Sequence, residues 1–401
     1  MIYTEKQKEL LRIFKSGGLK RLNLLDGSVR SGKTWISLVL WAFWVASMPK
    51  DKAFIMTGKT LTSLKRNCLD VLTELVGTDN FDYALHAKEG RLFGRKVYLE
   101  GVNDVRAEDK IRGLTLQGAY CDEVTLYEEA FFKMLLTRLS EKGAKFIGTT
   151  NPDNPSHWLK KNYIDNKKLD MLSMKFLLDE NTTLSREFIE NTKKENTGVF
   201  YDRFILGEWV AAEGLIYRLL ADNPERYMIE AKDVPELRYI NVGEDFGGNK
   251  SGHAIVRSGI NGNTLFFTHA KYKPAKGTTA TELTKWSINC FEEMGGVFDI
   301  YADSAEQVLI NELRTKTNRR IYNSLKLPIV DRIRFLNMLL STDRVKFVLG
   351  ETETLIEALS AATWDDKKIT DTRLDNGTYN NDIIDAAEYS FEYNMARLVR
   401  M

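Results

Sequence analysis

The stretch RLNLLDGSVRSGKTWISLVLWAF, residues 21–43, places a glycine-rich turn between an apolar run and a long hydrophobic segment. The turn has the spacing of a phosphate-binding loop, with Gly27, four residues, and then Gly32, Lys33 and Thr34. In such a loop backbone N–H groups surround the phosphates, while the lysine and the hydroxyl meet the terminal phosphates and magnesium. The following helix adds the positive end of its dipole. The stretch therefore predicts a strand, a phosphate-binding loop and a helix.

Two further apolar runs end in polar residues. In GAYCDE, Asp122 and Glu123 follow the run, where an aspartate can hold magnesium and a glutamate can polarise the attacking water. In IGTTNP, Thr149, Thr150 and Asn151 would lie at the carboxyl edge of a sheet, beside the terminal phosphate. A plain turn favoured by Asn-Pro is the other reading of IGTTNP.

Arg112 in KIRGLT comes shortly before the GAYC run and next to a glycine. It is a candidate for an arginine finger, which neutralises charge during phosphoryl transfer. A solvated surface arginine is the alternative.

The order of elements divides the chain. Thr4 and Gln7 have capping-box spacing before an amphipathic helix. Strands and helices then alternate, with a hairpin in RLFGRKVYLEG, which predicts a parallel sheet covered by helices on both faces. Residues 158–206 have a mainly helical pattern. After a boundary between Gly207 and Pro235, three strand-like runs follow in succession, and these indicate a different architecture.

Four aspartates are the candidate metal ligands of this second part. Asp245 and Asp303 stand near the ends of strand-like runs, and Asp382 and Asp385 lie three apart in NDIIDAAEY, on one face of an expected helix. Two-metal cleavage of a phosphodiester needs such hard oxygen ligands around ions about 4 Å apart. With 56 acidic residues in the chain, a chance arrangement is the alternative.

Composition narrows the class of protein. A formal net charge of +1 over 401 residues means that nucleic acid would have to be held by local basic clusters such as ELRTKTNRR, which could equally be a solvated helix face. The three widely spaced cysteines argue against disulfides and CxxC zinc sites, and indicate a reducing compartment. The start has no signal-peptide pattern, and the apolar stretch 35–48 is too short to span a bilayer.

In their order and spacing the motifs TEKQKELL, GSVRSGKT, KIRGLTLQGAYCDE, TTNP, LDENTTLSREFIE, RFILGEWV, GEDFG, YADSAE and NDIIDAAEY are similar to those of tailed-bacteriophage terminase large subunits. The resemblance covers nearly the whole chain. It implies an α/β protein with an N-terminal P-loop ATPase domain of the ASCE type, residues 1–212, a linker, residues 213–234, and a C-terminal RNase H-like nuclease domain with a mixed sheet, residues 235–401.

The resemblance also implies site residues and partners. ATP with Mg²⁺ would be held by Gly27, Ser28, Arg30, Ser31, Gly32, Lys33, Thr34, Asp122, Asn151 and Gln7, with Thr34 and Asp122 on the metal and Glu123 and Arg112 in catalysis. Two Mg²⁺ or Mn²⁺ ions would be held in the nuclease by Asp245, Asp303, Asp382 and Asp385. Many relatives have a histidine where this chain has Asp382, so the resemblance leaves open which of Asp382 and Asp385 is the third ligand. The expected partners are double-stranded DNA, the terminase small subunit and the portal protein. A homo-oligomeric ring is expected on the portal and a monomer in isolation, in the host cytoplasm and without a membrane.

Two other classes of protein stay open at this point. One is a helicase-like repair ATPase fused to a nuclease, and the other is a non-cleaving assembly protein that uses ATP as a conformational switch. DNA unwinding would identify the first, and a lack of plasmid cleavage would identify the second.

Overall fold

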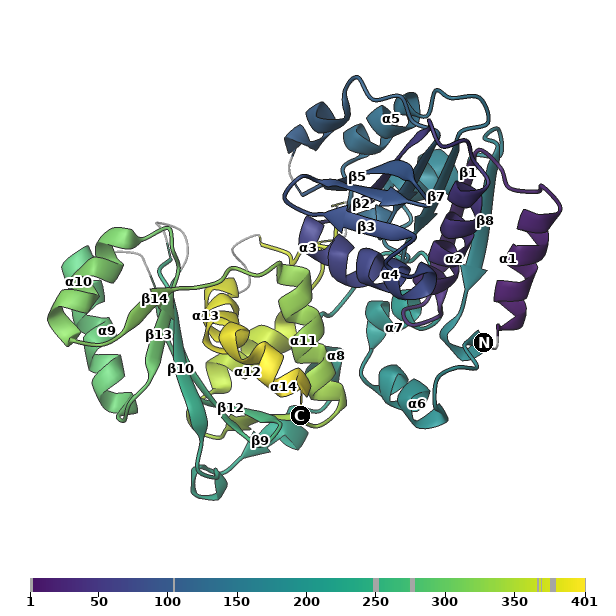
Figure 1. Ribbon diagram of the computed structural model, residues 1–401. Helices are drawn as coiled ribbons and strands as arrows, with labels where there is room; N and C mark the ends of the chain where they lie inside the picture. The colour runs from purple at the N-terminus through teal and green to yellow at the C-terminus, as the bar shows by residue number, and fades with distance from the viewer. Residues whose placement is uncertain are drawn as a thin grey trace. The chain divides into compact units, whose positions relative to one another are not determined.

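The computed structural model describes residues 3–103, 105–247, 252–274, 278–365, 368, 370–375 and 380–400. The chain splits into two compact units, the first made of Met1–Lys193 and Gly198–Ala211 and the second of Lys194–Thr197 and Ala212–Met401. Among the described residues each unit is built on one mixed β-sheet with helices packed against it (Figure 1). The α/β fold class is confirmed.

The sheet of the first unit has the strand order β3-β4-β5-β2-β6-β7-β1-β8. Its strands are β1 (Leu22–Gly27), β2 (Ala53–Gly58), β3 (Phe81–Ala84), β4 (Glu89–Leu92), β5 (Arg95–Gly101), β6 (Gly118–Cys121), β7 (Lys145–Thr149) and β8 (Met171–Phe176). From β5 to β8 neighbouring strands run parallel, whereas β3, β4 and β5 pair antiparallel. The predicted hairpin is β4 and β5, and it makes the sheet mixed rather than purely parallel.

Helices cover both faces of this sheet, as the alternation of strands and helices predicts. The helical segments of this unit are α1 (Glu5–Lys15), α2 (Lys33–Ala46), α3 (Leu61–Leu64), η1 (Lys65–Leu69), α4 (Asp70–Val76), η2 (Val105–Ile111), η3 (Val124–Leu126), α5 (Glu129–Arg138), η4 (Lys160–Ile164), η5 (Leu178–Glu180), α6 (Arg186–Lys194) and α7 (Gly198–Phe204). Leu25 of β1 packs in one core with Trp41 of α2, while Leu24 packs in the other with Phe132 of α5. Successive residues of a strand point to opposite faces, so β1 contributes to both cores.

The capping box predicted at the start of α1 is present. The Gln7 N–H donates to Thr4 Oγ1 at 3.2 Å, and the Thr4 N–H donates to Gln7 Oε1 at 3.1 Å. The stretch 158–206 is mainly helical, as the sequence predicts, but it also contains strand β8, which the sequence pattern did not predict. β8 pairs parallel with β1 along its whole length, and this pairing outweighs the weak local signal of MLSMKF.

The sheet of the second unit has the order β14-β13-β10-β11-β12-β15-β9. Its strands are β9 (Met228–Ile229), β10 (Arg238–Asp245), β11 (Gly252–Asn261), β12 (Thr264–Pro274), β13 (Asp299–Ala302), β14 (Ile321–Asn323) and β15 (Val345–Val348). The predicted meander is confirmed, since β10, β11 and β12 pair antiparallel in succession. The remaining pairs are parallel.

The helices of the second unit are α8 (Arg218–Asp222), η6 (Pro224–Tyr227), η7 (Ala231–Asp233), α9 (Ala280–Met294), α10 (Gln307–Thr317), α11 (Ile329–Ser341), α12 (Glu353–Ala361), α13 (Asn381–Phe391), η8 (Glu392–Asn394) and α14 (Met395–Arg400). Figure 1 shows α9 and α10 on one side of β10 and β13, with α13 on the other side. The stretch 213–234, for which the sequence predicts a linker, holds α8 and also β9, which pairs with β15 of this sheet.

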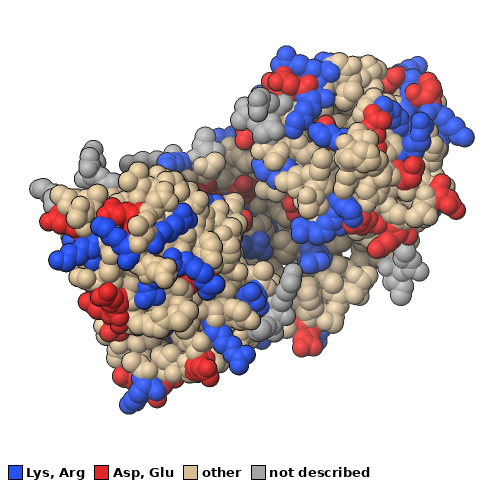
Figure 2. Space-filling view, turned by 60° about the vertical axis from the view of Figure 1, so that its left-hand side comes forward, with Lys and Arg blue, Asp and Glu red and all other residues tan. Residues whose placement is uncertain are grey.

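The mixture of charges on the surface and the apolar content of the helices both agree with the amino-acid composition. In the face drawn in Figure 2, Lys and Arg side chains are intermingled with Asp and Glu. Within the described ranges, every helix falls short of the length and apolar content that a membrane crossing needs. Cys68, Cys121 and Cys290 are buried and free, which agrees with the absence of a predicted disulfide framework.

Candidate functional site

The predicted strand–loop–helix arrangement at Gly27–Thr34 is present. β1 ends at Gly27, and α2 begins at Lys33 after Gly32, whose φ of 84° is in the left-handed region that favours glycine. Gly27 also has a positive φ, and a Cβ there would lie 2.1 Å from the Phe176 carbonyl oxygen. Both glycines are thus required by backbone geometry, and the loop leaves the carboxyl edge of the sheet, where phosphate sites of α/β proteins form.

Lys33 points back over the loop. Its Nζ donates to the carbonyl oxygens of Gly27 at 3.0 Å and Ser28 at 2.6 Å and to Asn151 Oδ1 at 3.0 Å. Burial lowers the pKa of Lys33 to about 8, although the charges of Asp26, Glu123 and Asp122 act in the opposite direction. A buried ammonium held by neutral carbonyls gains from an anionic partner, because charge-assisted hydrogen bonds are stronger than those to neutral acceptors.

Asp122 and Glu123 lie at the same sheet edge, directly after β6. Thr149 Oγ1 donates to Asp122 Oδ1 at 2.8 Å and accepts from the Glu123 N–H at 3.2 Å. Glu123 has φ 54°, an unusual conformation for a residue with a side chain, which clusters at functional sites. Thr149 therefore fixes both acidic residues, and Asn151, two residues on, contacts Lys33.

The back of the loop is held by a segment whose role sequence reasoning missed. The Val29 N–H donates to the Phe204 carbonyl oxygen at 2.9 Å, and Ser28 Oγ donates to the Ile205 carbonyl oxygen at 2.5 Å. On the other side, the Ser28 N–H donates to the Phe176 carbonyl oxygen at 2.9 Å. The loop is thus fixed between β8 and the end of α7.

Three side chains complete this support. Asn181 Nδ2 donates to the Arg30 carbonyl oxygen at 2.7 Å, and Trp209 Nε1 donates to Asp26 Oδ2 at 3.2 Å. Burial raises the pKa of Asp26, while the hydrogen bond from Trp209 acts in the opposite direction. A carboxyl group inside an otherwise apolar strand needs a buried partner, and that is the signal by which Asp26 could have been found from the sequence.

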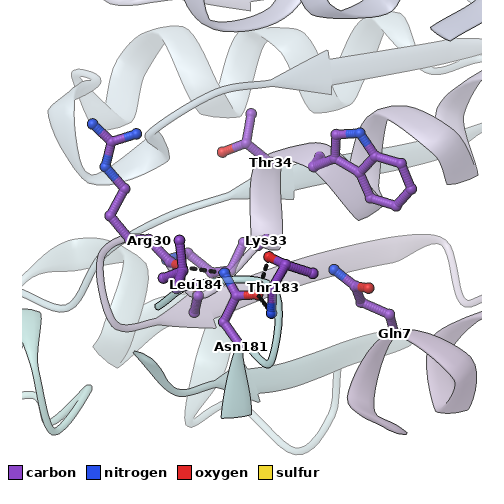
Figure 3. A pocket seen from close by; sticks show the side chains of 10 residues that line it. Gln7, Arg30, Lys33, Thr34, Asn181, Thr183 and Leu184 are labelled. Carbon is purple, nitrogen blue, oxygen red and sulfur yellow. Dashed lines mark hydrogen bonds between the residues drawn. The ribbon is translucent and has the colours of Figure 1, made fainter. Parts of the chain in front are cut away.

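A cavity of about 680 Å³ opens beside the loop. It is lined by Gln7, Arg30, Ser31, Gly32, Lys33, Thr34, Trp35, Asn181, Thr183 and Leu184 (Figure 3). Figure 3 shows Asn181 and Thr183 hydrogen-bonded together, with the 2.7 Å bond from Thr183 Oγ1 to Asn181 Oδ1 among those drawn. A Cβ on Gly32 would lie 2.9 Å from Gln7 Nε2, so the Gln7 amide faces the loop. The cavity combines apolar walls with polar groups at the loop, as ligand sites do.

Arg112 lies apart from this lining. It follows η2 at the surface, 3.0 Å from Asp109 and 3.4 Å from Glu108 in two ion pairs, and its side chain is 60% exposed. The structure brings together the loop, Asp122, Glu123 and Asn151, but it does not place Arg112 among the residues that line the cavity.

In the second unit, alternation along β10 directs Asp245 toward α13. Glu244 faces α9, where Ser287 Oγ donates to its Oε1 at 2.5 Å. Gly243 faces α13, and a Cβ on it would lie 1.8 Å from the Ala386 carbonyl oxygen. Asp245 is two residues after Gly243, so its side chain is on the same face of β10 and points toward α13. Asp303 follows the parallel neighbour β13, and its N–H donates to the Glu244 carbonyl oxygen at 3.1 Å.

The four predicted aspartates influence one another electrostatically. The pKa of Asp245 is raised well above its ordinary value, first by burial and then by the charges of Asp385, Asp382 and Asp303. Each of these three also has a donor of its own. Gly252 N–H donates to Asp382 Oδ2 at 2.6 Å, Arg373 Nη2 donates to Asp385 Oδ1 at 2.6 Å, and Asp303 forms an ion pair with the lysine at position 326.

Asp385 belongs to a buried ionic network. Arg373 contacts both Asp385 and Glu388, and Arg332 Nη1 lies 2.7 Å from Glu388 Oε2. Burial raises the pKa of Glu388 to about 8, while the charges of Arg373 and Arg332 act in the opposite direction. Removing one partner of such a network leaves an uncompensated buried charge, so Asp385 has a structural role in orienting α13.

The donor set of this cluster fits a divalent cation, because it is made of hard carboxylate oxygens whose mutual repulsion a cation would relieve. In the described part of the chain, no three Asp, Glu, His or Cys side chains are placed so that they could hold a metal ion. The carboxylates are turned toward their own donors, and side-chain rotation is needed to bring them onto one ion.

The basic cluster ELRTKTNRR is used within the unit. Arg314 donates to the Ile321 carbonyl oxygen at 2.8 Å, and the guanidinium of Arg319 lies 4.5 Å from the ring centre of Phe298. Lys316 and Arg320 form ion pairs with Glu312 at 2.6 Å and Asp299 at 2.7 Å. These contacts favour the structural reading of the cluster.

Comparison with known proteins agrees with this architecture. The family model for the N-terminal part of T4likevirus-type terminase large subunits matches residues 24–221. The chain is similar over 98% of its length to 99% of the large terminase of a thermophilic bacteriophage, with 26% identity and a TM-score of 0.86.

The same thermophilic-phage terminase in complex with ADP has a TM-score of 0.83 at 24% identity, over 96% of this chain and 98% of that chain. In complex with ATP-gamma-S it has a TM-score of 0.82 at 24% identity, over 97% of this chain and 98% of that chain. No curated protein sequence matches the chain significantly.

The two α/β units have the fold of a large terminase. Residues 24–221 match the family model of the N-terminal part of terminase large subunits, and the chain as a whole has the fold of a large terminase. Both matches agree with the resemblance noted in the sequence.

Proposed function

We propose that this chain is the motor and nuclease of a DNA-packaging machine. ATP hydrolysis at the Gly27–Thr34 loop drives translocation of double-stranded DNA into the procapsid, and a metal-dependent endonuclease in the second unit cuts concatemeric DNA. The first unit is the P-loop ATPase of the ASCE type, and the second is the RNase H-like nuclease. Terminase large subunits are generally ATPases, and the thermophilic-phage terminase binds ADP and ATP-gamma-S. The small subunit and the portal protein are the proposed partners.

The observation that carries the ATPase proposal is the position of Lys33, a buried ammonium held over the loop by Gly27, Ser28 and Asn151. The loop N–H groups and Lys33 bind the phosphates, and the γ-phosphate replaces the carbonyls as the partner of Lys33. Thr34 and Asp122 would hold Mg²⁺, which would supply positive charge against the phosphate oxygens. Glu123, fixed through Thr149, accepts a proton from the attacking water.

In the second unit, Asp245, Asp303 and Asp382 would hold the divalent ions of the nuclease, and the chemistry that these ions would supply is activation of water and stabilisation of the leaving oxygen. Asp385 stays with Arg373 and orients the helix that carries Asp382. Support comes from the carboxyl groups at the ends of two parallel strands and their mutual effect on the pKa of Asp245.

One experiment tests both proposed enzymatic activities. The purified full-length chain is incubated with supercoiled plasmid and Mn²⁺ or Mg²⁺, with and without ATP, while phosphate release is followed. Cleavage and ATP hydrolysis are both expected. ATP hydrolysis without any cleavage would favour the ATP-switched assembly protein, and strand separation would favour the helicase-like repair enzyme.

Glu123→Gln keeps the shape of the side chain but removes the proton acceptor. We expect ATP hydrolysis to fall by about a hundredfold or more, while the affinity for ATP stays near the parental value. Phosphate release and binding of a fluorescent nucleotide measure the two quantities. Glu129→Gln is the matched control, because Glu129 forms a surface ion pair with Lys133 at 2.9 Å. Equal losses of binding and hydrolysis would mean that Glu123 has only a structural role.

Arg112 is proposed to act in hydrolysis at the site of a neighbouring subunit, since an exposed arginine outside its own cavity lining is available to another copy. Arg112→Ala should hydrolyse ATP slowly, and its mixture with Lys33→Ala should recover part of the parental rate, because intact sites form at mixed interfaces. Steady-state phosphate release over a series of mixing ratios measures this. Parental activity of Arg112→Ala alone would remove Arg112 from the mechanism.

A further inference from the structure

The turn between β14 and α11 is held in a conformation that residues with side chains rarely adopt. Lys326 has φ 48°, in the left-handed region. The N–H groups of Leu325, Lys326 and Leu327 donate to the Glu392 carboxylate at 3.0, 3.2 and 3.0 Å. Glu392 is 3% exposed, and its Oε1 lies 3.5 Å from Arg332 Nε. Strain of this kind persists only where the surroundings fix it, and it is concentrated at functional sites.

The turn directs the Lys326 side chain into the carboxylate cluster. Lys326 Nζ forms an ion pair with Asp303 Oδ1, and the Ala305 N–H donates to the same oxygen at 2.8 Å. The side chain of Asp303 is only 18% exposed. The positive charge of Lys326 also acts on Asp245, against the charges of the neighbouring carboxylates. The Lys326 side chain itself is 43% exposed, so its ammonium is a partly solvated member of the cluster.

We propose that Lys326 is the built-in cation of the nuclease site and competes with divalent metal ions for Asp303. The inference rests on the proposed nuclease function. A metal ion held by Asp303 has to weaken or displace the Asp303–Lys326 ion pair, so Lys326 sets the metal concentration at which the site fills. Glu392 acts as a positioning residue, because its carboxylate holds the turn from which Lys326 reaches Asp303.

The balance of charges in the cluster gives the direction in which the loss of Lys326 should change the affinity for a cation. With Lys326 in place, Asp303 is already neutralised, and Arg373 does the same for Asp385. Removing the ammonium leaves the cluster with one more uncompensated negative charge, which favours cation binding. A metal ion at Asp303 has to break one charge-assisted hydrogen bond, so a change of about tenfold in cation affinity is the expected order of magnitude.

The test measures Mn²⁺ affinity directly in the full-length chain, by isothermal titration without DNA or nucleotide. Lys326→Met should bind Mn²⁺ about tenfold more tightly than the parent. Lys326→Arg keeps the charge and should stay near the parental affinity. Lys316→Met is the matched control, since it removes an exposed lysine that pairs with Glu312. The effect of Lys326→Met should vanish when it is combined with Asp245→Asn, which distinguishes this cluster from the Asp122 site.

Plasmid cleavage at increasing Mn²⁺ provides a second readout. The concentration that gives half-maximal cleavage should fall by the same factor in Lys326→Met. Unchanged Mn²⁺ affinity, or weaker binding together with lost cleavage in folded protein, would overturn the inference while leaving the nuclease proposal in place. If the parent binds Mn²⁺ more weakly than Lys326→Met but neither cuts DNA, the competition is supported and the nuclease proposal fails. Lys326→Gln repeats the measurement if the methionine variant does not fold.

Discussion

Replacement of Lys33 by alanine should lower ATP turnover by about a hundredfold or more. The variant loses the buried ammonium that donates to Gly27, Ser28 and Asn151 and that we expect to neutralise charge on the transferred phosphoryl group. Phosphate release under saturating ATP measures the loss, and plasmid cleavage with Mn²⁺ alone should be unchanged.

The control for this variant is Lys20→Ala, because Lys20 forms a surface ion pair with Asp170 at 3.4 Å. Circular dichroism checks that both proteins are folded. ATP hydrolysis by Lys33→Ala at the parental rate would contradict the assignment of Gly27–Thr34 as the nucleotide-binding loop.

Asp245→Asn should eliminate DNA cleavage and leave ATP turnover intact. Asp245 is 8% exposed at the end of β10, and an amide in its place cannot supply the negative charge that holds a divalent cation. The measurement is the rate of plasmid nicking in Mn²⁺. Asp303→Asn should behave in the same way, and cleavage by Asp245→Asn at the parental rate would refute the metal-dependent mechanism.

The same substitution should change the dependence of stability on pH. The raised pKa of Asp245 means that the metal-free folded protein holds a proton which the unfolded chain has already released. Stability therefore falls as the pH rises through this interval, and Asp245→Asn should remove that part of the fall. Mn²⁺ should raise the thermal midpoint of the parent, because it binds the folded state.

Substitutions of the two aspartates of α13 should give different results in the same assays. Asp382→Asn should impair cutting more than Asp385→Asn. Asp385→Asn should instead lower the thermal midpoint, because it removes the negative charge that pairs with Arg373 in the buried network. If Asp385→Asn impairs cutting more than Asp382→Asn, the metal ligand is Asp385 and not Asp382.

Local patterns were sufficient for most of the fold. The Thr4–Gln7 capping box, the glycines at positions 27 and 32 and the alternation along β10 to β12 each act within a few residues, so the sequence displays them directly. Strand β8 was missed because its pairing with β1 connects residues about 150 positions apart, and its own apolar signal is weak.

The residues of the site that belong to local motifs could also be predicted from the sequence, whereas the long-range contacts that support them could not. Lys33, Asp122 and Asn151 follow from the loop and the strand ends, and the structure brings them to one sheet edge. The support from Asn181 and Trp209 depends on side chains 151 and 183 residues from their partners. In the second unit, helical spacing placed Asp382 and Asp385 on one face, but only the fold shows that Arg373 engages the second of them.

The contact at Gly243 has a consequence for how this sequence can vary. A Cβ there would lie 1.8 Å from the Ala386 carbonyl oxygen and 2.6 Å from the Ser390 nitrogen, both of which belong to the backbone of α13. No rotamer change can relieve a clash with backbone atoms, so any side chain has to push the helix off the strand. Even alanine is therefore not tolerated at this position. The distance between the carboxylates of β10 and those of α13 depends on Gly243 having no side chain.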